Sequence, residues 1–221
     1  GKQNVVNPLL DSLGVQMLNG TIVQKSRDYS FDLVTPNLAA GAIAMDKSLQ
    51  QFYMYKMVVS MPNAGALSYG QQGGFSVHPL LVSDAQSSWI KKGKFTLDSA
   101  ALVVDHLKGD QEGSFPTALM LTRNVKNKEQ RIIVSADADF FSNTELSRNN
   151  LQTLNTNFAM SIFRWFSYGE FPIDVSRPAS NDNMTTLDKA YVKPIQILYY
   201  FVIPGAIFLM GLIILIRRKR K

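Results

Sequence analysis

Cysteine is absent from the 221 residues of this chain, and histidine occurs only twice. Without cysteine the chain can form no disulfide, iron–sulfur cluster or thiolate zinc site, and it has no cysteine nucleophile. The two histidines, His78 and His106, lack the short spacing that is typical of metal ligands. The sequence therefore predicts neither a metal site nor a cofactor, and it identifies no catalytic histidine.

Charged residues are also scarce, at 18%, and the net charge of +6 is concentrated at one end. Five of the 23 basic residues are the last five, from Arg217 to Lys221, and the other 18 are balanced by 17 acidic residues. A protein that binds nucleic acid usually carries a basic patch on its folded domain. The near-neutral body thus argues against a nucleic-acid partner.

One long stretch has no charge at all, the 22 residues from Ile195 to Ile216. As an α-helix this stretch would be about 33 Å long, enough to cross a hydrocarbon core of about 30 Å. The aromatic pair Tyr199-Tyr200 is typical of a membrane interface, and Pro204-Gly205 is tolerated in membrane helices even where it introduces a kink. The basic tail that follows predicts a cytoplasmic C-terminus, which places most of the chain outside the cytoplasm.

The chain therefore divides into four expected segments. They are an extracytoplasmic domain over residues 1–175, a polar tether over 176–193, a transmembrane helix over 194–216 and a basic cytoplasmic tail over 217–221. No signal peptide precedes the domain, so we expect an upstream export signal or membrane segment and a larger parent protein.

Two segments of the domain carry helix signals. Residues 7–14 begin with Asn7 as a helix N-cap and Pro8 in the first turn, and Gly14 ends the segment. Residues 149–168 predict the longest helix before the membrane segment, and Gly169 ends it. Its apolar side chains recur at helical spacing: Leu151, Leu154, Phe158, Ile162, Trp165 and Phe166.

Four segments have the branched and aromatic composition of strands: residues 21–24, 51–62, 117–123 and 131–137. The last one, RIIVSAD, is a continuous apolar run that ends in acid and is followed by a helix. This pattern is typical of a buried parallel strand in an α/β sheet. Residues 62–75 are rich in glycine but lack the P-loop spacing, so they predict a flexible connection.

Asp137 and Asp139 follow this apolar run, and their spacing fits three interpretations. An Asp-x-Asp motif after a strand resembles that of haloacid-dehalogenase phosphatases, but the acids after Asp139 are too scattered for a magnesium site. In the second interpretation, the motif is that of a glycosyltransferase and holds a metal-bound nucleotide. Such an enzyme would need a supply of nucleotide sugar outside the cytoplasm. The sequence favours the third interpretation, in which the aspartates accept backbone N–H bonds in a tight turn.

The order of segments is similar to that of a known family. It runs from NPLLDSLGVQMLNGTIVQ through HPLL, FTLDS, TALMLTR and RIIVSADADFFSN to a helix ending in FRWF, a tether and a terminal span with a basic tail. This order resembles the C-terminal half of GldG-like proteins, auxiliary, substrate-binding-like components of gliding-motility-type ABC transporters. The resemblance implies a partly parallel α/β domain of the flavodoxin or glutamine-amidotransferase type, without that enzyme's catalytic cysteine.

The resemblance also implies a location and partners. We expect a single-pass protein of the bacterial inner membrane, periplasmic in its bulk, that works without catalysis beside an ABC permease and an ATPase. Its candidate binding surface is the turn with Asp137, Asp139 and Asn143, and then His78. The alternatives are a membrane-tethered hydrolase of phosphate or sugar that uses the aspartates, and a structural envelope protein. The ligand is not identified by the sequence.

Overall fold

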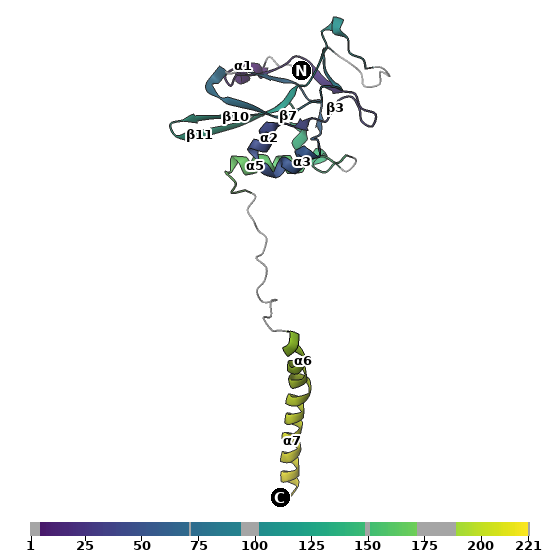
Figure 1. Ribbon diagram of the computed structural model, residues 1–221, viewed down its shortest axis with the longest axis vertical. Coiled ribbons are helices and arrows are strands. Elements are labelled where there is room, and N and C mark those ends of the chain that lie inside the picture. Colours follow the sequence, from purple (N-terminus) through teal and green to yellow (C-terminus); the bar gives the residue numbers. More distant parts are fainter. Residues whose placement is uncertain (1–4, 71, 94–101, 149–150, 172–188, 221) are drawn as a thin grey trace. The chain divides into compact units, whose positions relative to one another are not determined.

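The computed structural model describes residues 5–70, 72–93, 102–148, 151–171 and 189–220. The chain divides into two compact units, residues 1–174 and residues 175–221. The first unit is a domain of short helices and several small sheets, and the second contains one long helix (Figure 1). Most of the expected tether lies outside the described residues.

The largest sheet has four strands in the order β11-β10-β7-β4, and every neighbouring pair is antiparallel. Its members are β4 (Asn37–Leu38), β7 (Ser76–Val82), β10 (Pro116–Val125) and β11 (Lys128–Ser135). The turn between β10 and β11 consists of Lys126 and Asn127, whose φ angles are 51° and 62°. Positive φ at both positions defines a type I′ turn, which suits the twist of a hairpin.

The expected parallel sheet of the flavodoxin or glutamine-amidotransferase type is therefore wrong. Parallel neighbours need a crossover of about a dozen residues, whereas a two-residue turn joins β10 to β11. The continuous apolar run at residues 131–137 has another cause, because both faces of this antiparallel sheet are covered: Ile133 of β11 packs on one core cluster, and Ile132 and Val134 pack on the other. Met120 enters one core cluster, and Leu119 and Leu121 enter another. The coarser prediction of a mixed α/β domain is confirmed.

Three smaller sheets complete the domain, and all of their strand pairs are antiparallel. One pairs β1 (Val15–Met17) with β6 (Leu67–Tyr69), and another pairs β3 (Leu33–Val34) with β5 (Met61–Pro62). The third has the order β2-β8-β9, with β2 (Thr21–Gln24), β8 (Ser88–Lys91) and β9 (Gln111–Glu112). The strand expected at residues 21–24 is thus confirmed.

Helices cover both faces of the four-stranded sheet (Figure 1). On one side lie α2 (Ala40–Met45), α3 (Gln50–Met54) and α5 (Asn155–Phe166), with the 3-10 helix η2 (Lys47–Leu49) beside them. The larger core cluster packs between this layer and the sheet. On the other side, α1 (Asn7–Asp11), β1 and β6 cover the second cluster, which contains Leu119, Leu121 and Phe75.

Several local predictions were wrong. The segment 51–62 is not one strand, because α3 ends at Met54 and β5 begins at Met61. The glycine-rich segment 62–75 is not a free connection, since it contains β6 and buries Ala64, Ala66 and Leu67.

Two helix ends also differ from expectation. Asn7 does not cap α1 but ties it to β1, since its Oδ1 accepts the N–H of Met17 at 2.9 Å. The long helix begins at Asn155, later than expected, and ends near Gly169, whose N–H bonds to the carbonyl of Arg164 at 2.8 Å. Of its predicted apolar stripe, Leu154, Phe158 and Ile162 are buried, as expected, whereas Phe166 is exposed.

The second unit contains a continuous helix from Ala190 to Lys219, 30 residues long. It comprises α6 (Lys189–Ile197), a π-helical turn over Leu198–Val202 and α7 (Ile203–Lys219). The wide turn directly precedes Pro204, which lacks the N–H of a regular helix and whose ring would collide with the carbonyl four residues earlier. This helix is apolar and long enough to cross a membrane, and it begins within the segment expected to be the tether.

Candidate functional site

The turn after β11 holds the two aspartates of the Asp-x-Asp motif. β11 ends at Ser135, and a 3-10 helix, η5 (Asp139–Phe141), follows two residues after Asp137. The Oδ1 atom of Asp137 accepts the backbone N–H of Asp139 at 2.8 Å, and the Ser135 hydroxyl donates to the carbonyl of Asp137 at 2.6 Å. This is the hydrogen bond expected of an aspartate in the turn after a strand.

The second carboxylate oxygen of Asp137 has a different environment from the first. Oδ2 is buried and has no hydrogen-bond partner among the described residues. The pKa of Asp137 is raised to about 6, mainly by burial; the negative charges of Asp139 and Glu145 contribute to the rise, and hydrogen bonds from backbone N–H groups oppose it. A carboxyl group with a pKa near neutrality can exchange a proton under physiological conditions.

An Asp137→Asn substitution is expected to stabilise the domain at neutral pH. Because the pKa is raised from 3.8 to about 6, the stability that Asp137 contributes is complete below pH 3.8 and is lost as the pH rises through 6. Asparagine keeps the Oδ1 acceptor and carries no charge. For a half-buried group we expect a gain of about 1–2 kcal/mol at pH 8 that disappears near pH 4.

Urea unfolding at both pH values, monitored by tryptophan fluorescence, measures this difference. Asp28→Asn is the control, because Asp28 is an exposed aspartate in the segment after β2 and its substitution removes the same charge. If Asp137→Asn increased the free energy of unfolding by the same amount at both pH values, the raised pKa of Asp137 would be contradicted.

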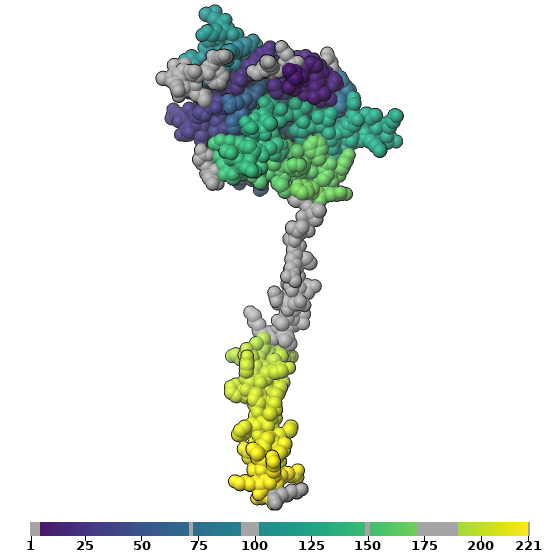
Figure 2. Space-filling view, turned by 180° about the vertical axis from the view of Figure 1, so that it is seen from behind, coloured from purple at the N-terminus to yellow at the C-terminus, as the bar shows by residue number. Residues whose placement is uncertain are grey.

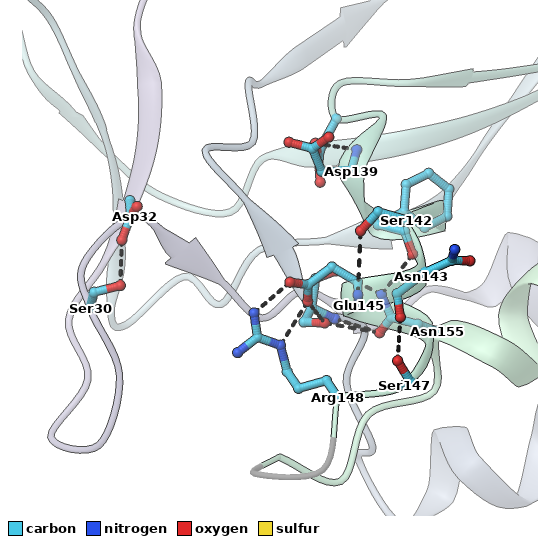
Figure 3. A network of polar contacts seen from close by, with 12 residues as sticks. Ser30, Asp32, Asp139, Ser142, Asn143, Glu145, Ser147, Arg148 and Asn155 are labelled. Atoms are coloured by element: carbon cyan, nitrogen blue, oxygen red, sulfur yellow. Dashed lines mark hydrogen bonds and ion pairs between the residues drawn. The ribbon is translucent and has the colours of Figure 1, made fainter.

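A short helix, α4 (Asn143–Leu146), follows the turn, and Figure 3 shows its polar contacts. Ser142 caps this helix by accepting the N–H of Glu145 at 3.3 Å. Asn143, a predicted site residue, is exposed on the first turn. Its backbone carbonyl accepts hydrogen bonds from Ser147. The structure thus places Asp137, Asp139 and Asn143 in one compact stretch, from which the Asn143 side chain is accessible.

His78 does not join this group. It lies within β7, opposite Met120. Its ring is exposed and interacts with the Ser76 hydroxyl at 3.0 Å. No hydrogen bond or ion pair within the described part of the chain connects His78 to the turn.

A buried polar cluster beside this turn was not predicted from the sequence. Glu145 is 2% exposed, and its carboxylate forms a two-pronged ion pair with Arg148, in which Nε donates to Oε2 at 2.8 Å and Nη2 donates to Oε1 (Figure 3). The hydroxyl of Ser60, 85 residues earlier, donates to the same carboxylate. Burial alone would raise the pKa of Glu145, but the hydrogen bonds from Arg148 and Ser60 and the charge of Arg148 lower it below 4.5.

Asn155 connects this cluster to the backbone of two other segments. Its Oδ1 accepts the N–H of Ser60 at 2.9 Å, and its Nδ2 donates to the carbonyls of Ser60 at 2.9 Å and Phe140 at 3.0 Å. The amide thereby joins the start of α5 to η5 and to the segment before β5. Its polar groups are fully used in these contacts, as buried amides require.

Glu145 could have been recognised from the sequence. Ser142 and Glu145 have the S-x-x-E spacing of a capping box, and Glu145 and Arg148 have the i, i+3 spacing of a helical ion pair. The Glu145 side chain does not complete the capping box, because Arg148 and Ser60 bind it. Ser60 and Asn155 lie 95 residues apart, and no local pattern connects them.

The cluster has a structural role, because it holds segments of the domain together that are distant in the sequence. Arg148 pairs with the Glu145 carboxylate and lowers its pKa, so Glu145 is a weak base for the Ser60 hydroxyl, and both residues are buried. The described residues contain no group of three or more acidic or histidine side chains that could hold a metal ion.

A separate cleft of about 680 Å³ lies beside α3. It is lined by apolar and aromatic side chains such as Tyr53 and Met57, with Gln24, Asn37 and Asp84 as polar groups. Its volume is within the range of small-molecule sites. None of the residues expected from the sequence lines this cleft.

Comparison of the chain with protein-family models, curated proteins and solved structures found no match.

Proposed function

We propose that this chain is a membrane-anchored, non-catalytic auxiliary subunit of an ABC-type export complex. Its domain would serve binding or assembly outside the cytoplasm, and its helix would dock against the permease. The observation that carries the proposal is the helix Ala190–Lys219, whose most apolar window is entirely unburied within the chain. Apolar surface of this extent needs lipid or other membrane helices around it.

The helix is apolar on all sides. Large side chains along it are mostly exposed, for example Phe201 at 73%, Phe208 at 69% and Leu215 at 67% (the helix is the yellow segment in Figure 2). Arg217, Arg218 and Lys219 close the helix. A positive end of this kind favours a cytoplasmic C-terminus in the bacterial inner membrane and a periplasmic domain.

The transporter partners follow from two arguments. The order of segments resembles that of GldG-like transporter components. The chain also lacks a phosphate-binding P-loop, so an ATPase and a permease would have to be separate proteins.

Purification of the full chain from native membranes in mild detergent tests the proposal. We expect a permease and an ATPase to co-purify in stoichiometric amounts. In the matched control, residues 195–216 are replaced by leucines of the same number, which preserves a membrane span but removes the specific docking surface. Equal recovery with both chains, or no transporter partner with either, would contradict the proposal.

A membrane-tethered hydrolase is the second candidate, and one observation favours it. The buried Oδ2 of Asp137, with a pKa of about 6, has the properties of a general acid or base. Activity on phosphate or sugar esters that falls by orders of magnitude in Asp137→Asn, while the domain stays folded, would establish this alternative.

A further inference from the structure

The last part of the folded domain exposes a group of aromatic rings. Phe163 is 52% exposed, Phe166 43%, Tyr168 67% and Phe171 40%. Phe163 and Phe166 are three positions apart on α5 and therefore share one side of the helix. These four residues, here called the α5 aromatic surface, stand out because isolated exposed apolar residues are ordinary but grouped ones mark contact surfaces.

Other side chains hold these rings in place. Phe163 packs on Phe141 and Phe171, with ring centroids 6.3 and 5.9 Å apart. The guanidinium of Arg131 lies 3.7 Å from the Tyr168 ring centre and also interacts with the backbone carbonyl of Trp165. The rings are thus supported from within the domain, while large parts of them face outward.

A second apolar group belongs to the same helical layer. On α3 and directly after it, Tyr53 is 47% exposed, Met54 73% and Tyr55 79%. η2 contacts both α3 and α5, so the two groups lie on neighbouring elements. In Figure 1, α3 and α5 lie on the same side of the sheet.

The charges around these groups are mainly basic. Lys47 on η2 and Lys56 after α3 are exposed, whereas Arg164 is paired with Asp46 at 2.8 Å. Glu170 is the exposed acid next to the α5 aromatic surface. Aromatic side chains beside lysines are the composition of surfaces that insert into the interface of a bilayer, where rings reach the acyl boundary and ammonium groups bind phosphates.

We propose that the α5 aromatic surface and the exposed part of α3 rest on the lipid headgroup region of the membrane that anchors the chain. This inference rests on the membrane anchoring in the proposed function. Phe171 is joined to the apolar helix by the 17 residues from 172 to 188. A segment of this length spans at most about 60 Å, so Phe171 can be no farther than this from the start of the helix.

Spin labelling of the full chain in lipid nanodiscs tests the contact. Because the chain has no cysteine, each introduced cysteine is a unique labelling site. Labels at Phe166→Cys and at Met54→Cys report on the proposed surface, and a label at Leu107→Cys, a fully exposed position on η4 (His106–Lys108), is the matched control. A label at Ile207→Cys reports independently on insertion of the helix.

In nanodiscs with anionic phospholipid, the labels at 166 and 54 are expected to collide several-fold more with oxygen than with a water-soluble nickel chelate, relative to the label at 107. If the label at 207 is accessible from lipid but the labels at 166 and 54 are both accessible from water, the proposed lipid contact is overturned. The anchoring of the chain by its helix is then unaffected. Water accessibility at 207 would overturn the anchoring, and this inference with it. If the labels at 166 and 54 became protected from the nickel chelate only when the permease is added, the surface would bind a protein partner. This result would also overturn the proposed lipid contact.

Discussion

Replacement of Asn155 with alanine is expected to lower the free energy of unfolding of the domain by about 4 kcal/mol. The substitution removes the amide that accepts the N–H of Ser60 and donates to the carbonyls of Ser60 and Phe140. Asn155 is 1% exposed, so water does not readily replace these hydrogen bonds. Each buried polar group that loses its partner costs about 1–3 kcal/mol.

Chemical denaturation of the full chain in detergent, followed by tryptophan fluorescence, measures this loss. Trp165 is on the same helix as Asn155 and therefore reports on its unfolding. Asn157→Ala is the matched control, since Asn157 is on the same helix but exposed, and its replacement should change stability by less than about 0.5 kcal/mol. Similar small effects of the two substitutions would contradict the proposed role of Asn155.

The strands of the central hairpin could be predicted from the sequence, but their direction was predicted wrongly. TALMLTR and RIIVSAD form most of β10 and β11, as expected. The continuous apolar run suggested a parallel sheet, yet the better signal was the short polar segment between the strands. Only Lys126 and Asn127 form the turn, and a connection so short permits an antiparallel pair alone.

The turn with Asp137 was predictable because its hydrogen bond is local, from residue 139 to residue 137. The buried cluster was not predictable, because Ser60 must meet Glu145 and Asn155 across 85 and 95 residues. The structure of the glycine-rich segment 62–75 was predicted wrongly for a similar reason. Gly65 donates its N–H to the carbonyl of Ala136, and the two neighbouring alanines are buried, so the tertiary fold and not the local composition decides its structure.

Arg148→Ala is expected to destabilise the domain by about 3–5 kcal/mol at neutral pH, because it leaves a buried carboxylate without its counter-charge. The side chain of Glu145 is 3% exposed, and that of Arg148 is 19% exposed. Once Arg148 is gone, the Ser60 hydroxyl alone cannot offset the desolvation of Glu145. The pKa of Glu145, which the pair lowers below 4.5, should then rise above that value, since burial opposes ionisation.

The pH dependence follows from the sign of this shift. With a lowered pKa, Glu145 contributes stability above pH 4.5 that is lost as the pH falls through its pKa in the folded state. In Arg148→Ala, acid instead neutralises the uncompensated charge. Unfolding curves between about pH 7 and pH 4 should therefore show the difference between the native chain and the variant become smaller as the pH falls. A constant difference would mean that Arg148 acts through packing.

A double variant separates the role of the charges from that of the packing. Glu145→Gln with Arg148→Met removes both charges, retains an acceptor for the Ser60 hydroxyl and keeps most of the side-chain volume. It should recover most of the stability lost in Arg148→Ala, because a buried ion pair is costly mainly when one partner is missing. Lys128→Ala, at the exposed first residue of β11, controls for the loss of a positive charge.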